Sequence, residues 1–321
     1  MPPIIPFDDH NFFLTFLVTV LLQLSCFLIA WTCQFDKITD LAGSINFILL
    51  ALLTLFANTN GQIQSRAILV TSCLCIARLE LALYLFYRVL KRGKDARFDT
   101  MRSQFVPFLI FWIFQIIWVW LVSLPVIFIN SEISSAPLPL FSDGRDIFGL
   151  ILFLIGFITQ VISDLQKDTF RANIANKEHV CDIGIWKYSR HPNFFGEIIM
   201  WWSIIIIASP QLDSSSSKWG WIVILSPLFT MFILLFGSGI PTAEGNNQLR
   251  FMKTIEAKAK YEAYRWKTSP LIPLPNFLYA RIPLVIKRWF LFEFTMYEVS
   301  DTDTQNSDII TASTSLVPNK S

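Results

Sequence analysis

Seven apolar runs in this chain are long enough to cross a bilayer, and they constrain its fold more than any other feature. A spanning helix needs about 17–25 mostly apolar residues. In lipid, such helices satisfy all their backbone hydrogen bonds internally. The sequence therefore predicts an all-α, polytopic helical bundle with about seven transmembrane helices. Six is the main alternative, because one run is short and another contains Gln160. The runs lie at about 11–31, 41–57, 67–90, 105–129, 146–163, 195–209 and 219–240.

Composition agrees with a membrane protein and excludes some other classes. Charged residues make up 16% of the chain, against about 25% in soluble domains, and the mean hydropathy is +0.50. The formal net charge is only +2 and no basic run stands out, so we expect no nucleic-acid partner. Five cysteines and three histidines lack the spacing of metal ligands, so no metal site is predicted.

Basic residues predict the orientation in the membrane. With seven spans, Lys and Arg gather in the loops 32–40, 91–104 and 164–194 and in the segment after the last span, whereas the opposite side holds only Arg66, Arg145 and Lys218. The positive-inside rule then places the N-terminus outside or in a lumen and the C-terminus in the cytosol. The endoplasmic reticulum is the expected membrane.

Three parts follow from this pattern. Residues 1–34 form an N-terminal transmembrane helix, residues 35–292 the main membrane domain, and residues 293–321 a polar tail expected to be disordered. The stretches Glu256–Tyr264 and Ile282–Phe294 carry charges and aromatic residues that are typical of interfacial helices.

A polar turn before the sixth run is the main candidate for a functional site. It runs from Gly184 to Glu197 on the predicted cytosolic side. Pro192 disfavours helix at the residue before it, so a helix is expected to begin at Pro192 or Asn193. Helix N-termini and a nearby Arg190 suit a phosphate or carboxylate group. Acidic Glu197, one turn inside, should point into a cavity rather than toward lipid.

Two flanking segments add ionisable residues. Asp164, Lys167, Asp168 and Arg171 share one face if their stretch is helical, although a solvated, salt-bridged helix end is the alternative. Glu244 comes just after the last run. It precedes a basic, aromatic segment with Tyr261, Tyr264 and Arg265, for which a lipid-headgroup anchor is the alternative.

The third run contains two polar side chains on one face. Glu80 and Tyr84 lie four residues apart, so a helix presents both together. Glu80 would act as a proton donor or would orient Tyr84. The alternative is that Arg78 makes an interhelical ion pair there. Gln115 and Gln160 are expected to form hydrogen bonds between helices.

Several ordered motifs lie between about residue 35 and residue 275. They are Arg78 to Leu85, Asp95-Ala96-Arg97-Phe98, Gln115 to Pro125, Asp164-Leu165-Gln166-Lys167, Gly184 to Trp202, Ser238-Gly239-Ile240-Pro241 and Leu271-Ile272-Pro273. Together they resemble the steroid 5-alpha-reductase C-terminal-domain family, most closely its less-characterised DUF1295-type branch.

This resemblance implies an intramembrane fold with a cytosol-facing pocket for NADPH and a lipidic substrate that arrives from the bilayer. Hydride would pass to a carbon–carbon double bond conjugated to a carbonyl, and a side-chain acid would supply the proton. The predicted catalytic residues are Glu80 and Tyr84. The cofactor contacts implied at matching positions are Asp164, Arg171, Arg190, Asn193, Glu197 and Tyr264, joined by Tyr188 and His191, and we add Glu244 to this set.

Two other functions remain open. Membrane methyltransferases of the isoprenylcysteine and phospholipid types share an Arg-His-Pro turn with a downstream Glu, and they bind S-adenosylmethionine. The segment from Trp186 to Glu197 fits either class. A catalytically inactive, lipid-binding relative is the third reading.

Overall fold

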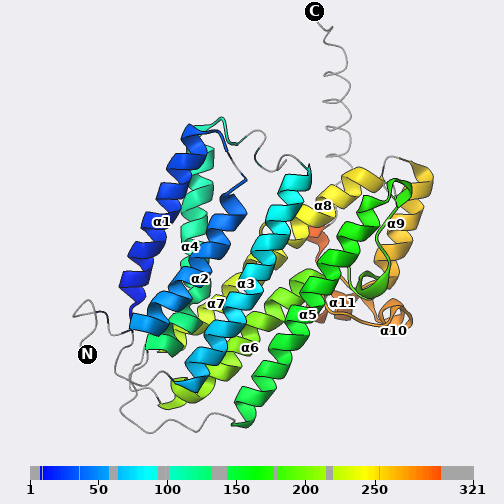
Figure 1. The fold of residues 1–321 in the computed structure, drawn as a ribbon. Helices are drawn as coiled ribbons and strands as arrows, with labels where there is room; N and C mark the ends of the chain where they lie inside the picture. The colour runs from blue at the N-terminus through cyan, green and yellow to red at the C-terminus, as the bar shows by residue number, and fades with distance from the viewer. Residues whose placement is uncertain are drawn as a thin grey trace, which may run out of the picture. The chain divides into compact units, whose positions relative to one another are not determined.

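The computed structural model describes residue 8, residues 10–35, 37–57, 64–92, 98, 101–131, 143–176, 179–214, 220–252 and 254–297. Its described residues form helices and short 3₁₀ turns, with no strand among them (Figure 1). Among the described residues, seven helical segments are long and apolar enough to cross a membrane, which confirms the predicted all-α, polytopic bundle. The helices are α1 Phe12–Thr32, α2 Thr39–Ala57, α3 Ser65–Arg92, α4 Phe105–Ser131, α5 Gly144–Ala172, α6 Pro192–Ser214, α7 Leu225–Phe236, α8 Ile240–Phe251, α9 Ile255–Lys267, α10 Asn276–Arg281 and α11 Leu284–Phe290.

The chain divides into two compact units. The first contains residues 1–157 and 198–230, and the second contains residues 158–197 and 231–321. Helices α5, α6 and α7 each contribute to both.

In the first unit, α2 packs against α3 and α4, and α1 packs against α4 and α2. Polar side chains hold these helices together as expected in a bilayer, where helix packing gains little from hydrophobic burial. Asn130 on α4 donates to Ala51 O at 2.9 Å and to Thr71 Oγ1 at 3.0 Å, and so joins three helices. Gln115 donates to Thr39 O at 2.9 Å, which confirms its predicted interhelical role.

Charged side chains in the first unit are also buried with partners. Arg66 on α3 makes a two-point ion pair with Asp146 on α5, at 2.7 and 2.8 Å. The guanidinium of Arg78 lies 5.2 Å from the ring centroid of Phe47 and 5.3 Å from that of Trp201. Cation–π contact of this kind is a favourable way to bury a guanidinium.

The last predicted span, 219–240, ends at a different residue from the helix in the structure. Helix α7 ends at Phe236. After a break from Gly237 to Gly239, the chain continues as α8 to Phe251, so Glu244 lies on a helix rather than just after one. Gly239 makes this close turn possible, because a Cβ there would lie 2.3 Å from Leu234 O.

The second unit ends later than residue 292, where the predicted membrane domain stops. Residues 293–297 pack within it, and the buried Tyr297 hydroxyl donates to Leu235 O at 2.9 Å. Residues 298–321 of the predicted tail lie outside the described residues. The short helix expected near 256–264 corresponds to α9, and the amphipathic segment expected near 282–294 contains α11.

Candidate functional site

The turn from Gly184 to Pro192 is attached to α5 on one side. Gly184 has φ of +53°, a conformation that side chains other than glycine rarely adopt, and it brings the next amide to Gln166. Ile185 N donates to Gln166 Oε1 at 3.0 Å, and Trp186 Nε1 donates to Ser163 O at 2.8 Å. Lys167 Nζ lies 4.1 Å from the Trp186 ring centroid. The start of the turn is thereby anchored on the last turns of α5.

The end of the turn is attached to the segment that follows α9. Ser189 Oγ donates to Leu271 O at 2.7 Å, and Arg190 N donates to Ser269 O at 2.8 Å. Leu274 N donates to Tyr188 O at 3.0 Å. These bonds explain why the Leu271-Ile272-Pro273 motif accompanies the Arg190 turn, since the segment that contains the motif holds the backbone of the turn. Helix α6 then begins at Pro192, as predicted.

A buried ionic cluster lies behind this turn. Its centre is Glu244 on α8, which is 1% exposed. Tyr261 donates its hydroxyl to Glu244 Oε2 at 2.6 Å, and His191 Nε2 lies 2.8 Å from Oε1. Arg190 Nη1 approaches the same oxygen at 3.4 Å, and Arg265 Nε lies 3.8 Å from Oε2. The carboxylate of Glu244 is thus the common partner of these four side chains.

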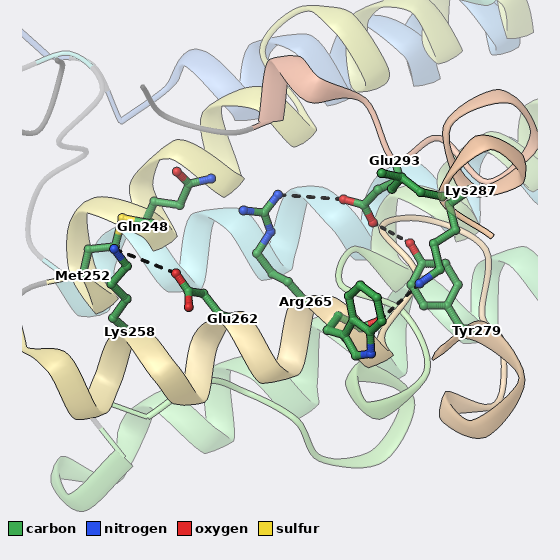
Figure 2. Close-up of a pocket in the computed structure, with 10 residues that line it drawn as sticks. Gln248, Met252, Lys258, Glu262, Arg265, Tyr279, Lys287 and Glu293 are labelled. Carbon is green, nitrogen blue, oxygen red and sulfur yellow. Dashed lines mark hydrogen bonds and ion pairs between the residues drawn. The ribbon is translucent and has the colours of Figure 1, made fainter. Parts of the chain in front are cut away.

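A second carboxylate, from Glu293, reaches the other side of Arg190. Arg190 Nη2 donates to Glu293 Oε1 at 2.6 Å and also contacts Oε2. Tyr279 donates its hydroxyl to Glu293 Oε2 at 2.5 Å, and Arg265 Nη2 lies 3.8 Å from Oε1 (Figure 2). Phe292, with φ of +60°, turns the chain after α11 so that Glu293 faces inward.

The electrostatics of the cluster follow from its burial. Burial opposes the charge of Arg190, but the carboxylates of Glu244 and Glu293 outweigh it and raise the pKa of Arg190, so the guanidinium stays charged. Burial, and then the nearby carboxylates, raise the pKa of Tyr261 and of Tyr279, so both remain donors. Burial also lowers the pKa of His191 despite its bond to Glu244, which favours a neutral imidazole that donates from Nε2.

Two cavities adjoin this cluster. One of about 20 Å³ has room for roughly one water molecule. It is lined by four predicted cofactor residues, Arg171, Arg190, Glu244 and Tyr264, among others. The second has a volume of about 450 Å³, within the range of about 300–1,000 Å³ for small-molecule sites (Figure 2). Its lining includes Lys258, Glu262, Arg265, Tyr279, Lys287 and Glu293.

The other predicted cofactor residues lie in the same unit. Asn193 donates to Asp164 Oδ1 at 3.2 Å, so the structure joins this pair across α6 and α5. Tyr264 donates its hydroxyl to Trp186 O at 2.7 Å and so holds the turn. Tyr188 is 41% exposed. Glu197 is half-buried on α6, one turn after Asn193.

The predicted catalytic pair belongs to the first unit. Glu80 and Tyr84 are both half-buried on α3, one turn apart, and the Arg88 guanidinium lies 5.6 Å from the Tyr84 ring centroid. They are therefore not among the side chains that the second unit brings together.

Five cluster or cavity residues were given no site role from the sequence: Tyr261, Arg265, Tyr279, Lys287 and Glu293. Tyr261, Tyr264 and Arg265 are spaced so that they share one helical face. This spacing was a usable signal for Tyr261 and Arg265. Glu293 carried no local signal, because it follows an apolar segment and meets its partner only through the fold. No three His, Cys, Asp or Glu side chains within the described ranges come together as metal ligands would.

Comparison with known proteins gives one family match. The sequence profile of a family described as "Protein of unknown function (DUF1295)" matches residues 26–268. No curated protein and no solved structure matches the chain. The matched region contains the Arg190 turn, Glu244 and Tyr264, and it ends before Tyr279, Lys287 and Glu293.

Proposed function

Because the chain belongs to the DUF1295 family, and because its motifs resemble those of steroid 5-alpha-reductases, we propose that it is a membrane-embedded, NADPH-dependent oxidoreductase. Its substrate would be a lipid or sterol-like molecule with a carbon–carbon double bond conjugated to a carbonyl. Reduced nicotinamide supplies a hydride when it is bound.

The state of Arg190 is the observation that carries this proposal. Its side chain is buried, yet Nε and Nη1 make no hydrogen bond within the described part of the chain. Nη1 has only the 3.4 Å approach to Glu244. Buried donors in native proteins nearly always have partners, so an orphaned guanidinium edge is what a site for a further anion predicts.

The surrounding residues fit an anionic nucleotide in their chemistry. Lys167, Arg171 and Arg190 supply cations around the smaller cavity, and Arg265, Lys258 and Lys287 supply them around the larger one. Tyr188 is exposed and offers a ring for stacking, whereas Trp186 is buried and Lys167 lies over its ring. The smaller cavity is too small for a dinucleotide, so binding requires the Arg190 side chain to leave Glu293 or the ligand to extend through the larger cavity.

Glu80 is our candidate for the proton that completes the reduction. A hydride added to the β-carbon of a conjugated carbonyl leaves an enolate, which a carboxylic acid protonates at the α-carbon. Tyr84 lies one turn further on the same helix and would hydrogen-bond the substrate carbonyl. Glu197, half-buried on α6, would accept a hydrogen bond from the amide or ribose of the cofactor.

Ligand-dependent melting of the detergent-solubilised protein tests the cofactor. A ligand at 100 times its dissociation constant adds roughly 2.7 kcal/mol of stability. We expect NADPH to raise the melting temperature, and Glu197→Gln to reduce that rise while the protein still folds. Arg190→Ala should also reduce the rise, but it should lower the melting temperature of the unliganded protein as well, because it leaves Glu244 and Glu293 without this partner. Stabilisation by S-adenosylmethionine and not by NADPH would assign the chain to the methyltransferase class instead.

Lipid analysis tests the reaction. Cells with and without the protein should differ in a lipid pair separated by two hydrogens. Glu80→Gln should lose this difference while binding NADPH like the unmodified protein. If NADPH binds but membrane lipids never promote its oxidation, the chain is an inactive, lipid-binding relative.

The topology is part of the proposal. The cofactor site would face the cytosol of an endoplasmic reticulum membrane, with the N-terminus in the lumen. An epitope at the C-terminus should be reached by antibody when only the plasma membrane is permeabilised, and one at the N-terminus should not. The reverse pattern would place the Arg190 turn away from cytosolic NADPH.

A further inference from the structure

The 450 Å³ cavity contains a buried lysine that has no acidic partner among the residues that the structure describes. Lys287 on α11 is 3% exposed. Its Nζ has one weak hydrogen bond, to Trp266 O at 3.4 Å. Two ring centroids lie nearby, that of Tyr279 at 4.2 Å and that of Trp266 at 4.7 Å. Within the described residues, no carboxylate oxygen lies within 4.0 Å of this ammonium.

The carboxylates that line the same cavity are engaged elsewhere. Glu293 holds Arg190 and accepts from Tyr279, and Glu262 lies 3.9 Å from Lys258 on the exposed side of α9. Burial lowers the pKa of Lys287 and Glu293 only partly opposes this, so the ammonium lacks full compensation.

The neighbouring rings do not remove the need for an anion. A cation–π contact contributes about 2 kcal/mol or somewhat more when it is desolvated. Burying an ammonium costs several kcal/mol even after the protein relaxes. Lysine is accordingly almost never fully buried unless it is paired. The cavity therefore has an excess of positive charge at Lys287.

A second cation points into the same space. Arg265 on α9 is 15% exposed, and its guanidinium lies between the Lys258 end and the Lys287 end of the cavity (Figure 2). An ammonium and a planar guanidinium together suit a doubly charged group with several acceptor oxygens. A phosphate monoester has these properties near neutral pH.

We propose that this cavity binds a phosphate monoester, with Lys287 and Arg265 as its ligands. One source rests on the proposed function, namely the ribose 2′-phosphate that distinguishes NADPH from NADH. The other source is the headgroup of a phosphatidic acid in the cytosolic leaflet. Helix α11 supports a membrane-surface position, since Val285, Trp289 and Phe290 are 67%, 78% and 71% exposed.

The test measures equilibrium binding to the full-length protein in phosphate-free buffer. NADPH is compared with NADH in detergent micelles, and nanodiscs of phosphatidylcholine with phosphatidic acid are compared with phosphatidylcholine alone. We expect Lys287→Met to weaken binding of the ligand that carries the phosphate monoester, NADPH or phosphatidic acid, at least tenfold, about 1.4 kcal/mol. Binding of NADH or of phosphatidylcholine, which lack this group, should not change. Lys287→Arg should retain binding. Arg288→Met removes the adjacent, exposed charge and should change nothing.

The outcomes separate this site from the proposed function. A Lys287→Met effect on NADPH but not on NADH identifies the cofactor phosphate. An effect on phosphatidic acid alone identifies the lipid, and it stands even if NADPH never binds. If NADPH binds but Lys287→Met changes neither pair, the phosphate site is overturned and the reductase proposal survives.

A variant that fails to fold does not end the test. In the unmodified protein, NADPH should bind at least tenfold more tightly than NADH, or nanodiscs with phosphatidic acid more tightly than those of phosphatidylcholine alone. Equal binding within both pairs overturns the proposal.

Discussion

Arg190 and Glu293 are paired across 103 residues of sequence, with Arg190 Nη2 bonded to both carboxylate oxygens and at 2.6 Å from Oε1. A single nitrogen therefore contacts both oxygens, whereas arginine binds a phosphate group through two parallel N–H···O bonds. The negative charge of Glu293 therefore lies on the same guanidinium as the Nε and Nη1 donors that make no hydrogen bond, and it would repel an anionic cofactor bound there.

Glu293→Gln should strengthen NADPH binding. The change removes a negative charge that competes with the cofactor phosphates, and like-charge repulsion at a binding site costs several kcal/mol when it is desolvated. We expect the dissociation constant to fall by about tenfold. Titration by intrinsic fluorescence measures it. Glu262→Gln is the matched control, because Glu262 lines the same cavity but is paired with Lys258 at 3.9 Å. An unchanged or higher dissociation constant for Glu293→Gln would contradict competition.

Glu244→Gln should destabilise the protein even without ligand. It removes the charge that holds Arg190 and accepts from His191 and Tyr261, and breaking a buried ion pair costs about 3–5 kcal/mol. The melting temperature of the unliganded protein should fall clearly. Glu256→Gln on the surface of α9, where the side chain pairs with Lys260, should have little effect. A normal melting temperature for Glu244→Gln would mean that the cluster does not support the fold.

Gly184→Ala should damage both stability and the Arg190 turn. Alanine at φ of +53° costs about 1–2 kcal/mol, and its Cβ would lie 2.2 Å from Gln166 Nε2. Thermal melting and NADPH titration should both show the loss. Gly245→Ala is a matched control on α8, where a Cβ meets nothing within 4 Å. That change should stabilise the helix by about 0.5–1 kcal/mol. Equal behaviour of the two variants would show that the left-handed turn is unimportant.

The pH dependence of stability should contain a contribution from His191. Its pKa in the folded protein lies below the ordinary value of 6.5, because burial favours the neutral ring. The unfolded chain then binds more protons between the two pKa values, so this stability is present above pH 6.5 and is lost as the pH falls below it. Melting temperatures between about pH 7.5 and 5.5 measure the slope. His191→Gln should flatten it, and His179→Gln, at an exposed position, should not. If the melting temperature of both variants changes with pH as it does in the unmodified protein, the pH effect belongs to other groups.

Much of the fold could be predicted because the signal is local. The apolar runs 11–31 and 105–129 correspond to α1 Phe12–Thr32 and α4 Phe105–Ser131. Pro192 marked the start of α6 because proline restricts the residue before it and suits the first helical turn. The end of the seventh span was less accurate, since the break at Gly239 resembles a helix end although α8 continues beyond it.

The candidate site could be predicted only in part. The sequence alone determined which stretches cross the membrane and where a basic turn interrupts them, because hydropathy and proline geometry act over a few neighbouring residues. Only the tertiary structure decided that Arg190 lies between Glu244 and Glu293, and that Lys287 is buried with no carboxylate of the described residues paired to it. Ion pairing and desolvation depend on which distant segments meet, and the chain path from α8 to η5 (Thr295–Tyr297) sets those meetings.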